Sequence, residues 1–509
     1  MTTAGFPFRN LGALVRPDAD PGKPALVDLS RAAPRTFSFA ALDALANAAA
    51  RGLLLRGLVR GDRVGLLAAN SAEFLAAFYG AQRAGLVPVP VPVPVPVNWR
   101  FPPGIVEYVL RDSGARVALH DAARAGAVPD GVPTVAMDGP AWDALLDPGP
   151  FEPVEPAPAE PAFFLYTSGS TGRPKGVVLS HQSHLWVVEQ RLAGADIGRE
   201  VALVAAPLYH MNGLALAQLA CAGHATVVLL PRFEARAYLA AIAAHRCTWI
   251  TGVPPMYAML LRERAALAAT DVSSVRNLRM GSAPVSPVLL AEIAAAFPRA
   301  RIINGYGTTE AGPVVFGPHP RGPPTPPLSV GCPHLAVDLR LRAEDGDLGG
   351  DQGVLEQRCP GLMNGYWNRP DLPPAFTEDG FYATGDVFRR DADGFHFFVG
   401  RSDDMFVSGG ENVFPGQVEK AIESHPAVEQ SAVIAVDDEI KGQKPMAFVV
   451  LRPGAAADEA ALKAHVLAHA PAYMHPRRVW FLDHLPLAGT NKVDKDALAA
   501  LARDRAGAT

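Results

Sequence analysis

The residues best suited to chemistry lie between Tyr166 and Gly176, in the run Tyr-Thr-Ser-Gly-Ser-Thr-Gly-Arg-Pro-Lys-Gly. Seven of these eleven residues are Thr, Ser or Gly. Glycines let a backbone approach a ligand closely, and concave runs of backbone N–H groups bind anions. The stretch therefore predicts a phosphate-binding loop, and its contributing residues are Thr167, Ser168, Gly169, Ser170, Thr171, Gly172 and Lys175.

This loop differs from the phosphate loop of the P-loop NTPases. Lys175 follows a proline, and Gly176 occupies the position of the Ser or Thr that binds magnesium in that motif. An apolar run over 162–165 precedes the loop and another over 177–179 follows it. We therefore predict a strand on each side and a helix that begins near Ser180.

A second candidate site is the run Asn-Gly-Tyr-Gly-Thr-Thr-Glu over 304–310, which follows a short apolar strand. Ligands in open α/β sheets bind beyond the carboxyl ends of strands. Tyr306 can offer an aromatic face to adenine, and Thr309 can donate to an α-phosphate. Glu310 can hold Mg²⁺, which prefers carboxylate and phosphate oxygens. The remaining nucleotide contacts predicted in this run are Gly307 and Thr308.

Two polar residues further along the chain extend the predicted nucleotide site. Asp386 ends the run Tyr-Ala-Thr-Gly-Asp, and a carboxylate there can accept two hydrogen bonds from ribose hydroxyls. Arg401 can hydrogen-bond ribose or phosphate. Alone, Asp386 would be interpreted as an ordinary turn residue, so its interpretation depends on the two motifs before it.

These motifs together resemble the signatures of the adenylate-forming superfamily, which includes acyl- and aryl-CoA synthetases, luciferases and the adenylation domains of peptide synthetases. The resemblance extends from about residue 35 to residue 498. It implies an α/β fold with a large N-terminal domain of layered mixed sheets and helices, over 1–402. A small hinged α+β C-terminal domain is expected over 403–509.

The resemblance also assigns roles that the residue types alone do not establish. Lys492, in the run Leu485 to Lys495, matches the catalytic lysine of the superfamily, and Lys495 is a weaker candidate because its offset in the motif is wrong. Asp403 matches the hinge. The glycines expected on the coenzyme A side are Gly409 and Gly410.

The acid-binding residues are likewise implied by the resemblance. His210 matches the residue at the mouth of the carboxylate pocket, and the residues expected to line that pocket are Gly281, Ser282, Ala283 and Gly305. No acidic residue occurs between Val201 and Leu230, so a substrate ammonium would have no partner there. The small lining residues and the lack of an obvious cationic one favour an aryl or short to medium acyl monocarboxylate.

The predicted activity is that of an ATP-dependent acid:CoA ligase, which forms an acyl-adenylate with release of pyrophosphate and then a thioester with release of AMP. Its cofactors would be ATP, Mg²⁺ and coenzyme A, and its partners small molecules. Two alternatives remain: an adenylation enzyme that loads a carrier protein, and a non-catalytic nucleotide-binding homologue. Retention of Lys175, Glu310, Asp386, Arg401 and Lys492 argues against the second alternative.

Composition places few other limits on function. The 509 residues carry a net charge of −5, without a basic block that would favour nucleic acid. Four separated cysteines, no signal sequence and no apolar span favour a reduced cytoplasmic protein, as a monomer or homodimer. Alternating Val and Pro over 87–97 predicts an extended segment that cannot be a central strand along its full length.

Overall fold

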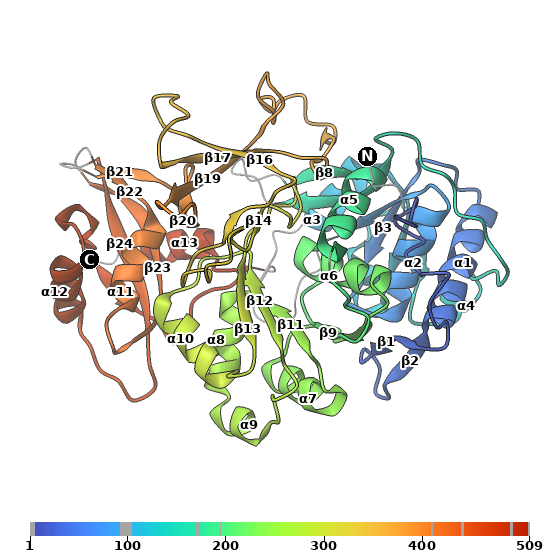
Figure 1. The fold of residues 1–509 in the computed structure, drawn as a ribbon, viewed down its shortest axis with the longest axis horizontal. Coiled ribbons are helices and arrows are strands. Elements are labelled where there is room, and N and C mark those ends of the chain that lie inside the picture. Colours follow the sequence, from blue (N-terminus) through green and yellow to red (C-terminus); the bar gives the residue numbers. More distant parts are fainter. Residues whose placement is uncertain are drawn as a thin grey trace.

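The computed structural model of the protein describes residues 6–91, 104–167, 174–193, 195–408, 411–438, 442–488 and 492–506. The chain forms a large N-terminal part of layered sheets and helices and a small C-terminal part, drawn in orange and red in Figure 1. This arrangement confirms the predicted fold class. No helix among the described residues is long and apolar enough to cross a membrane.

The first sheet of the large part has four parallel strands in the order β4-β3-β5-β6. Helices α1 and α2 begin after Ser38 and Ser71, because the hydroxyls of these residues accept hydrogen bonds from the first turns. The Val-Pro run contributes only the edge strand β4, and residues 92–103 lie outside the described residues. The elements are α1 (Phe39–Leu55), β3 (Arg63–Leu67), α2 (Ala72–Arg83), β4 (Val87–Pro90), α3 (Ile105–Asp112), β5 (Ala115–His120) and β6 (Thr134–Ala136).

A second sheet of seven strands, ordered β13-β12-β11-β9-β10-β1-β2, is parallel except for β2 at its edge. One apolar core joins α1, α2 and α6 between the two sheets, and another packs α7, α8 and α10 on the far face. The strands are β1 (Pro24–Asp28), β2 (Arg35–Ser38), β9 (Val201–Val204), β10 (Thr226–Leu229), β11 (Trp249–Gly252), β12 (Asn277–Gly281) and β13 (Arg301–Gly305). The helices are α5 (His181–Leu192), α6 (Met211–Ala222), α7 (Ala235–His245), α8 (Pro254–Arg262) and α10 (Pro287–Ala296).

Two antiparallel sheets complete the large part. The strands on both sides of the predicted phosphate loop form a hairpin, β7 with β8, and β18 pairs with β8. The other sheet has the order β16-β17-β19-β20 and ends at the proposed hinge. The strands are β7 (Pro161–Thr167), β8 (Lys175–Ser180), β16 (Asp338–Arg342), β17 (Gln352–Arg358), β18 (Gly365–Tyr366), β19 (Tyr382–Arg390) and β20 (His396–Arg401).

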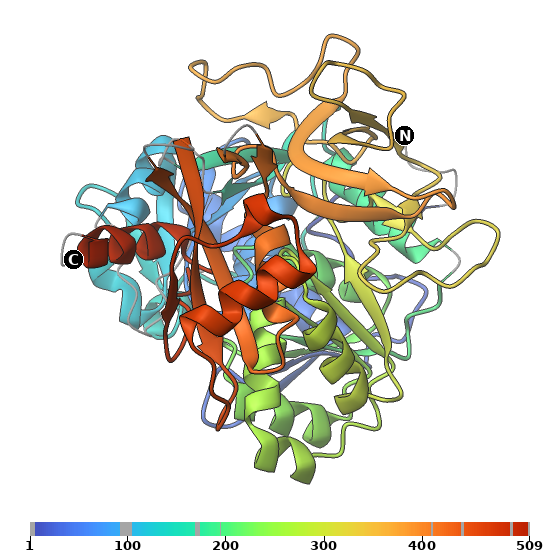
Figure 2. The same cartoon turned by 90° about the vertical axis from the view of Figure 1, so that its left-hand side faces the viewer.

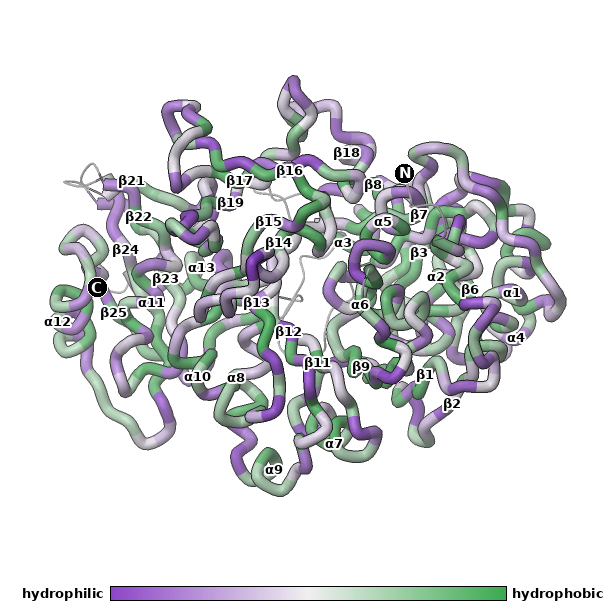
Figure 3. Tube along the Cα trace, in the orientation of Figure 1, coloured by the Kyte–Doolittle hydropathy of each residue, from purple (hydrophilic) through white to green (hydrophobic). Residues whose placement is uncertain are grey.

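The C-terminal part is built on a sheet ordered β22-β21-β24-β23, with β25 pairing β24. Apolar residues cover both faces: one face packs α11 and α12, and the other packs α13. Figure 3 shows hydrophobic segments running through the strands of both parts, with hydrophilic segments on the connecting turns. The elements are β21 (Phe406–Ser408), β22 (Glu411–Val413), α11 (Pro415–Glu423), β23 (Val428–Asp438), β24 (Gly442–Leu451), α12 (Glu459–His469), β25 (Val479–Phe481) and α13 (Lys495–Ala506).

The two parts contact each other through ion pairs and a small apolar cluster. Arg452 Nη1 lies 2.5 Å from Glu292 of α10, and Arg262 of α8 pairs with Glu429. Phe414 packs with Val387 and Val399 of the large part. Figure 2 shows the C-terminal part facing the viewer with the large part behind it. A rotation of the small part would have to break these contacts.

The carboxyl group of Glu423 makes this arrangement sensitive to pH. Burial raises its pKa to about 7. Glu419, one turn earlier on α11, raises it further, while Ser431 and Ser286 oppose the shift through hydrogen bonds. Lys420 also lies within the field of Glu423. Ser286 belongs to the large part, so this carboxyl group lies where the two parts meet.

A raised carboxyl pKa makes the folded protein bind the Glu423 proton more tightly than the unfolded chain does. Its contribution to stability is therefore present at low pH and is lost as pH rises from the ordinary carboxyl range through about 7. Since Glu423 is partly exposed, we expect a loss on the order of 1 kcal/mol. Thermal melts of wild type and Glu423→Gln between pH 5 and 8 measure it, and an unchanged slope in the variant would contradict the assignment.

Candidate active site

The hairpin of β7 and β8 fixes both ends of the predicted phosphate loop. Thr167 is the last residue of β7 and pairs directly with Lys175, the first residue of β8. The Thr167 hydroxyl is buried and has no hydrogen-bond partner among the described residues, so it is free to accept a ligand. The predicted loop residues that lie outside the described residues are Ser168, Gly169, Ser170, Thr171 and Gly172.

Tyr366 connects this loop to the predicted magnesium carboxylate. Its ring lies 4.8 Å from Lys175 Nζ, and its hydroxyl donates to Glu310 Oε1 at 3.0 Å. Pairing of β18 with β8 sets Tyr366 opposite Val177, two residues after Lys175, which explains how the residues meet. The backbone N–H of Met363 also donates to the Glu310 carbonyl, at 2.7 Å. Glu310 is buried and held from two directions.

The predicted ribose contacts form one hydrogen-bonded network. Tyr306 Oη donates to Asp386 Oδ2 at 2.5 Å, and Arg401 Nη1 donates to Asp386 Oδ1 at 3.1 Å. The same guanidinium binds both oxygens of Asp403, at 2.7 and 3.0 Å. Burial raises the pKa of Asp386, and the hydrogen bond with Asp403 raises the pKa of Arg401. The predicted hinge residue is thus joined to the predicted ribose residue through Arg401.

Lys492 enters this site from the C-terminal part. Leu487 pairs with Val493, and Ala488 N donates to the Lys492 carbonyl at 2.7 Å, so these two contacts fix the backbone of Lys492. Lys492 is exposed to solvent, yet desolvation by surrounding protein lowers its pKa, while the nearby charges of Asp386 and Glu310 oppose that shift. Lys495, the weaker candidate, instead pairs with Asp404 at 2.7 Å.

His210 lies close enough to Lys492 to respond to its charge. Burial lowers the pKa of His210 to about 3, and Lys492 lowers it further, so the imidazole is neutral at ordinary pH. The residue precedes the first turn of α6, and its Nε2 is buried without a partner among the described residues. A neutral ring with an unused nitrogen suits hydrogen bonding to an acid, and not charge neutralisation.

The residues expected to line the acid pocket lie at the end of β12, directly after it, and at the end of β13. Gly281 and Gly305 face each other in register, and a Cβ on Gly281 would lie 2.6 Å from the Gly305 carbonyl oxygen. Ser282 has a φ of 65°, in the left-handed region that favours glycine, and the next residue is the partly exposed Ala283. Gly307 is similarly close, because a Cβ there would lie 2.7 Å from the Gly312 carbonyl oxygen.

A cationic side chain, which the sequence did not indicate, lies beside one of the residues expected to line this pocket. The guanidinium of Arg279 lies directly against Gly305, where an added Cβ would meet Arg279 Nε at 2.5 Å. Arg279 lies on β12, and the contact of its side chain with Gly305 depends on the register of β12 with β13. Alternation along the strand, two residues before Gly281, was the signal that could have found it.

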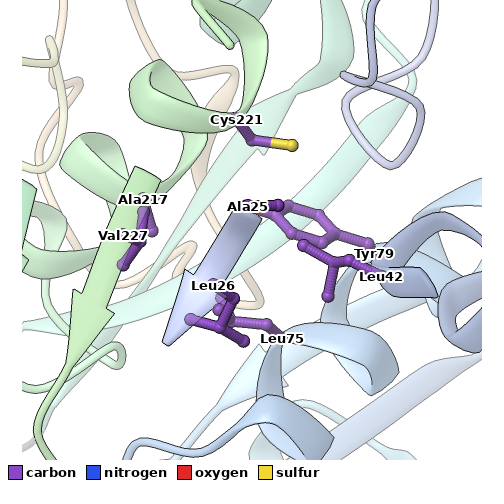
Figure 4. Close-up of a pocket in the computed structure, with 8 residues that line it drawn as sticks. All are labelled: Ala25, Leu26, Leu42, Leu75, Tyr79, Ala217, Cys221 and Val227. Carbon is purple, nitrogen blue, oxygen red and sulfur yellow. The ribbon is translucent and has the colours of Figure 1, made fainter. Parts of the chain in front are cut away.

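The structure therefore brings together most of the predicted site. Thr308 Oγ1 accepts from Ala311 N at 3.1 Å and so shapes the turn before Thr309 and Glu310. Gly409 and Gly410, expected on the coenzyme A side, lie outside the described residues. Figure 4 shows a small pocket elsewhere, between α1, α2, α6, β1 and β10. Its lining is almost wholly apolar and includes none of the predicted site residues, so it is a packing defect of the core.

Tyr366 has no role that the sequence assigned, and its contacts predict one in positioning Glu310. We expect Tyr366→Phe to keep the ring beside Lys175 but to lower kcat/KM for ATP about 10-fold, because a hydrogen bond to a charged group is lost. Initial rates at varied ATP and Mg²⁺ measure this. Tyr473→Phe, in the C-terminal part, is the matched control, and equal effects of the two variants would contradict the assignment.

The geometry defines a class of protein first. Thr167 and Lys175 at the two ends of the loop, a buried carboxylate network and a lysine from a second part are combined as in enzymes that adenylate carboxylic acids. The family model of AMP-binding enzymes matches residues 15–367, and that of the AMP-binding enzyme C-terminal domain matches residues 417–492. The chain belongs to the AMP-binding enzyme family, in its acyl- and aryl-CoA synthetase branch, and is an AMP-forming acid–thiol ligase.

Similar proteins include ligases for different acids. A feruloyl-CoA synthase of Amycolatopsis sp is 34% identical over 454 residues, which covers 88% of this chain and 90% of that protein. A sulfoacetate–CoA ligase of Cupriavidus necator is 33% identical over 515 residues, with coverage of 96% and 97%. Aromatic and very short acids are both represented among these relatives.

The crystal structure of ATP-bound MatB from Rhodopseudomonas palustris is 30% identical and superimposes with a TM-score of 0.87, over 97% of this chain and 99% of that chain. The apo form of MatB, with the same coverage, superimposes with a TM-score of only 0.75. The present chain is therefore more similar in overall structure to the ATP-bound form than to the apo form.

Proposed function

We propose that the protein activates an aryl or short to medium acyl acid in two steps on one site, with coenzyme A as the final acceptor. In the first step a carboxylate oxygen bonds to the α-phosphorus of ATP, and the bond to pyrophosphate breaks. In the second step a thiol bonds to the acyl carbon, its proton passes to solvent, and the acyl–oxygen bond breaks to release AMP. The observation that carries this proposal is that the Lys492 ammonium, from the C-terminal part, lies near enough to Asp386 and Glu310 for their charges to act on its pKa.

The first step requires two anions to be held together. Lys175 and the hydroxyls of its loop would bind the β- and γ-phosphates, with Thr309 at the α-phosphate. Asp386 and Arg401 would bind the ribose, and Tyr306 would contact adenine. Lys492 would bridge the acid carboxylate and the α-phosphate, while neutral His210 would donate to the carboxylate or to the developing oxyanion.

Magnesium fits the carboxylate that Tyr366 positions. Among the described residues, no group of three or more His, Cys, Asp or Glu side chains could hold a metal by itself. Glu310 would therefore supply one ligand, with phosphate oxygens and water supplying the others. Bound there, Mg²⁺ would neutralise charge on the phosphate oxygens. A buried, hydrogen-bonded carboxylate of this kind suits that role.

The second step would use a different arrangement of the two parts. We place the domain boundary at residues 402 and 403, with Asp403 as the hinge, because Asp403 follows the last strand of the large part and pairs with Arg401 of that strand. Rotation there would withdraw Lys492 and bring Gly409 and Gly410 towards the pantetheine arm. Hinge rotation about a few residues between elements is a common form of domain motion.

A panel of carboxylic acids tests the proposal directly. Each acid is incubated with ATP and Mg²⁺, with and without coenzyme A, and AMP, pyrophosphate and thioester are measured. Thioester and AMP in equal amounts, dependent on coenzyme A, are the expected result. Acyl-adenylate without thioester would favour the carrier-protein alternative. ADP in place of AMP, or no nucleotide turnover with any acid, would contradict the proposal.

A further inference from the structure

The side of the seven-stranded sheet that carries the predicted acid site also carries an arginine. Arg279 lies on β12, in register with Thr251 of β11 and two residues before Gly281. Side chains two residues apart share a face of a strand, so Arg279 and Gly281 face the same way. The guanidinium crosses to β13 and lies against Gly305.

This face is also the one to which His210 is tied. Thr251 Oγ1 donates to Asn212 Oδ1 at 2.9 Å, which joins the first turn of α6 to β11. His210 is the residue immediately before that turn. The mouth of the predicted acid site and the guanidinium of Arg279 therefore lie on one side of the sheet, on neighbouring elements.

A second arginine stands beside the first. Arg191, in the last turn of α5, has its guanidinium carbon 5.8 Å from the centre of the Trp249 ring. Trp249 lies on β11, the strand that pairs with β12 and Arg279, so Arg191 lies over the neighbouring strand. Burial lowers the pKa of Arg191, and the positive charge of Arg279 lowers it further. Two like charges in a partly desolvated place repel each other unless an anion lies between or beside them.

No such anion comes from the described part of the chain. Neither guanidinium makes a hydrogen bond or ion pair to a described residue, and no carboxylate acts on the pKa of either one. Trp249 Nε1 is buried and also lacks an acceptor among the described residues. Elsewhere the chain pairs its buried arginines: Arg83 lies 2.6 Å from Asp43.

We propose that Arg279, with Arg191 beside it, binds a second anionic group of the acid that is activated, a carboxylate or a sulfonate. The inference rests on the proposed function, because it identifies a second anionic group on the acid that the proposed reaction activates. A planar guanidinium donates two parallel hydrogen bonds to such a group. Gly305 immediately precedes Tyr306 of the nucleotide site, so the second anion lies near the adenylate end. The substrate is therefore a short acyl or aryl acid with two anionic groups.

The test compares acids of equal length that differ only in the second anion, such as succinate with butyrate and malonate with propionate. Rates of coenzyme A-dependent AMP formation are measured for wild type, Arg279→Met, Arg279→Lys and Arg191→Met. Arg276→Met is the matched control, since Arg276 is exposed, precedes β12 and pairs with Glu200 at 3.2 Å. Binding of each acid is measured separately by calorimetry.

We expect wild type to favour the acid with two anionic groups by about 100-fold in kcat/KM. This is the ratio expected from the free energy of a hydrogen bond to a charged group. Arg279→Met should lose that preference mainly through KM, with rates on butyrate within about 3-fold of wild type, and Arg279→Lys should recover part of it. A wild-type preference for uncharged tails, or an equal loss on all acids in Arg279→Met, would overturn the inference.

The two proposals can fail separately. If uncharged monocarboxylates are ligated and the arginine variants change nothing, the ligase assignment stands and the second anion is wrong. If no acid is turned over but succinate or malonate binds wild type and not Arg279→Met, the anion site stands and the proposed function is wrong. Because Arg279→Lys keeps the charge, it serves where Arg279→Met fails to fold.

Discussion

Replacement of Lys492 by alanine is expected to lower acyl-adenylate formation about 100- to 1000-fold, the range for removing one charged group from a developing phosphate charge. The structure places the Lys492 charge in the field of Asp386, Glu310 and His210, where the acid and the α-phosphate are expected to meet. Pyrophosphate exchange or hydroxamate formation measures this step. Thioester formation from a supplied acyl-adenylate should change far less.

Two lysine variants make that experiment specific. Lys463→Ala removes a surface ion pair with Glu459 and should leave adenylation unchanged. Lys495→Ala tests the weaker candidate, whose ammonium pairs with Asp404. If Lys495→Ala abolishes adenylation and Lys492→Ala does not, the assignment of the catalytic lysine is wrong. If both half-reactions fall equally in Lys492→Ala, the residue acts on folding or domain position instead.

Replacement of Asp386 by asparagine is expected to raise KM for ATP about 10- to 100-fold, because hydrogen bonds from ribose to a carboxylate become weaker. Asp386 already accepts from Tyr306 and Arg401, and a carboxylate with two oxygens has acceptor capacity left for a ligand. An amide would place a donor where those protein donors point. Initial rates at varied ATP, with the acid saturating, give the measurement.

Asp379→Asn is the matched control for this variant. Asp379 also pairs with an arginine, Arg340 at 2.5 Å, but is half-exposed and belongs to no predicted contact. It should leave KM for ATP unchanged. An Asp386→Asn enzyme with normal KM for ATP and a lowered melting temperature would show that Asp386 serves the hinge network with Arg401 and Asp403, and does not bind nucleotide.

The sequence predicted the two strands beside the phosphate loop and the helix after them because their local signals are strong. Ser38, Ser71 and Ser180 each stand before an apolar periodic run and cap the helix that follows. The nucleotide side of the site was predicted in the same way, from glycine-rich motifs. These features depend on a few neighbouring residues, so tertiary packing did not alter them.

Contacts between distant strands could not be predicted in this way. The role of Tyr366 depends on β18 pairing with β8 almost 190 residues earlier in the chain. The position of Arg279 against Gly305 depends on the register of β12 with β13. A shift of one residue would have turned Arg279 into the opposite core. The sequence alone therefore could not indicate the positive charge of Arg279 beside Gly305.

In the proposed reaction, the acid is activated when one of its carboxylate oxygens forms a bond to the α-phosphorus of ATP. The most direct measurement uses a substrate acid labelled with oxygen-18 in its carboxyl group, ATP, Mg²⁺ and coenzyme A, followed by mass analysis of the products. We expect one labelled oxygen in AMP and none in pyrophosphate. The carboxylate oxygen that bonds to the α-phosphorus stays there, since the acyl–oxygen bond breaks in the second step. Unlabelled AMP, or label in inorganic phosphate together with ADP, would contradict it.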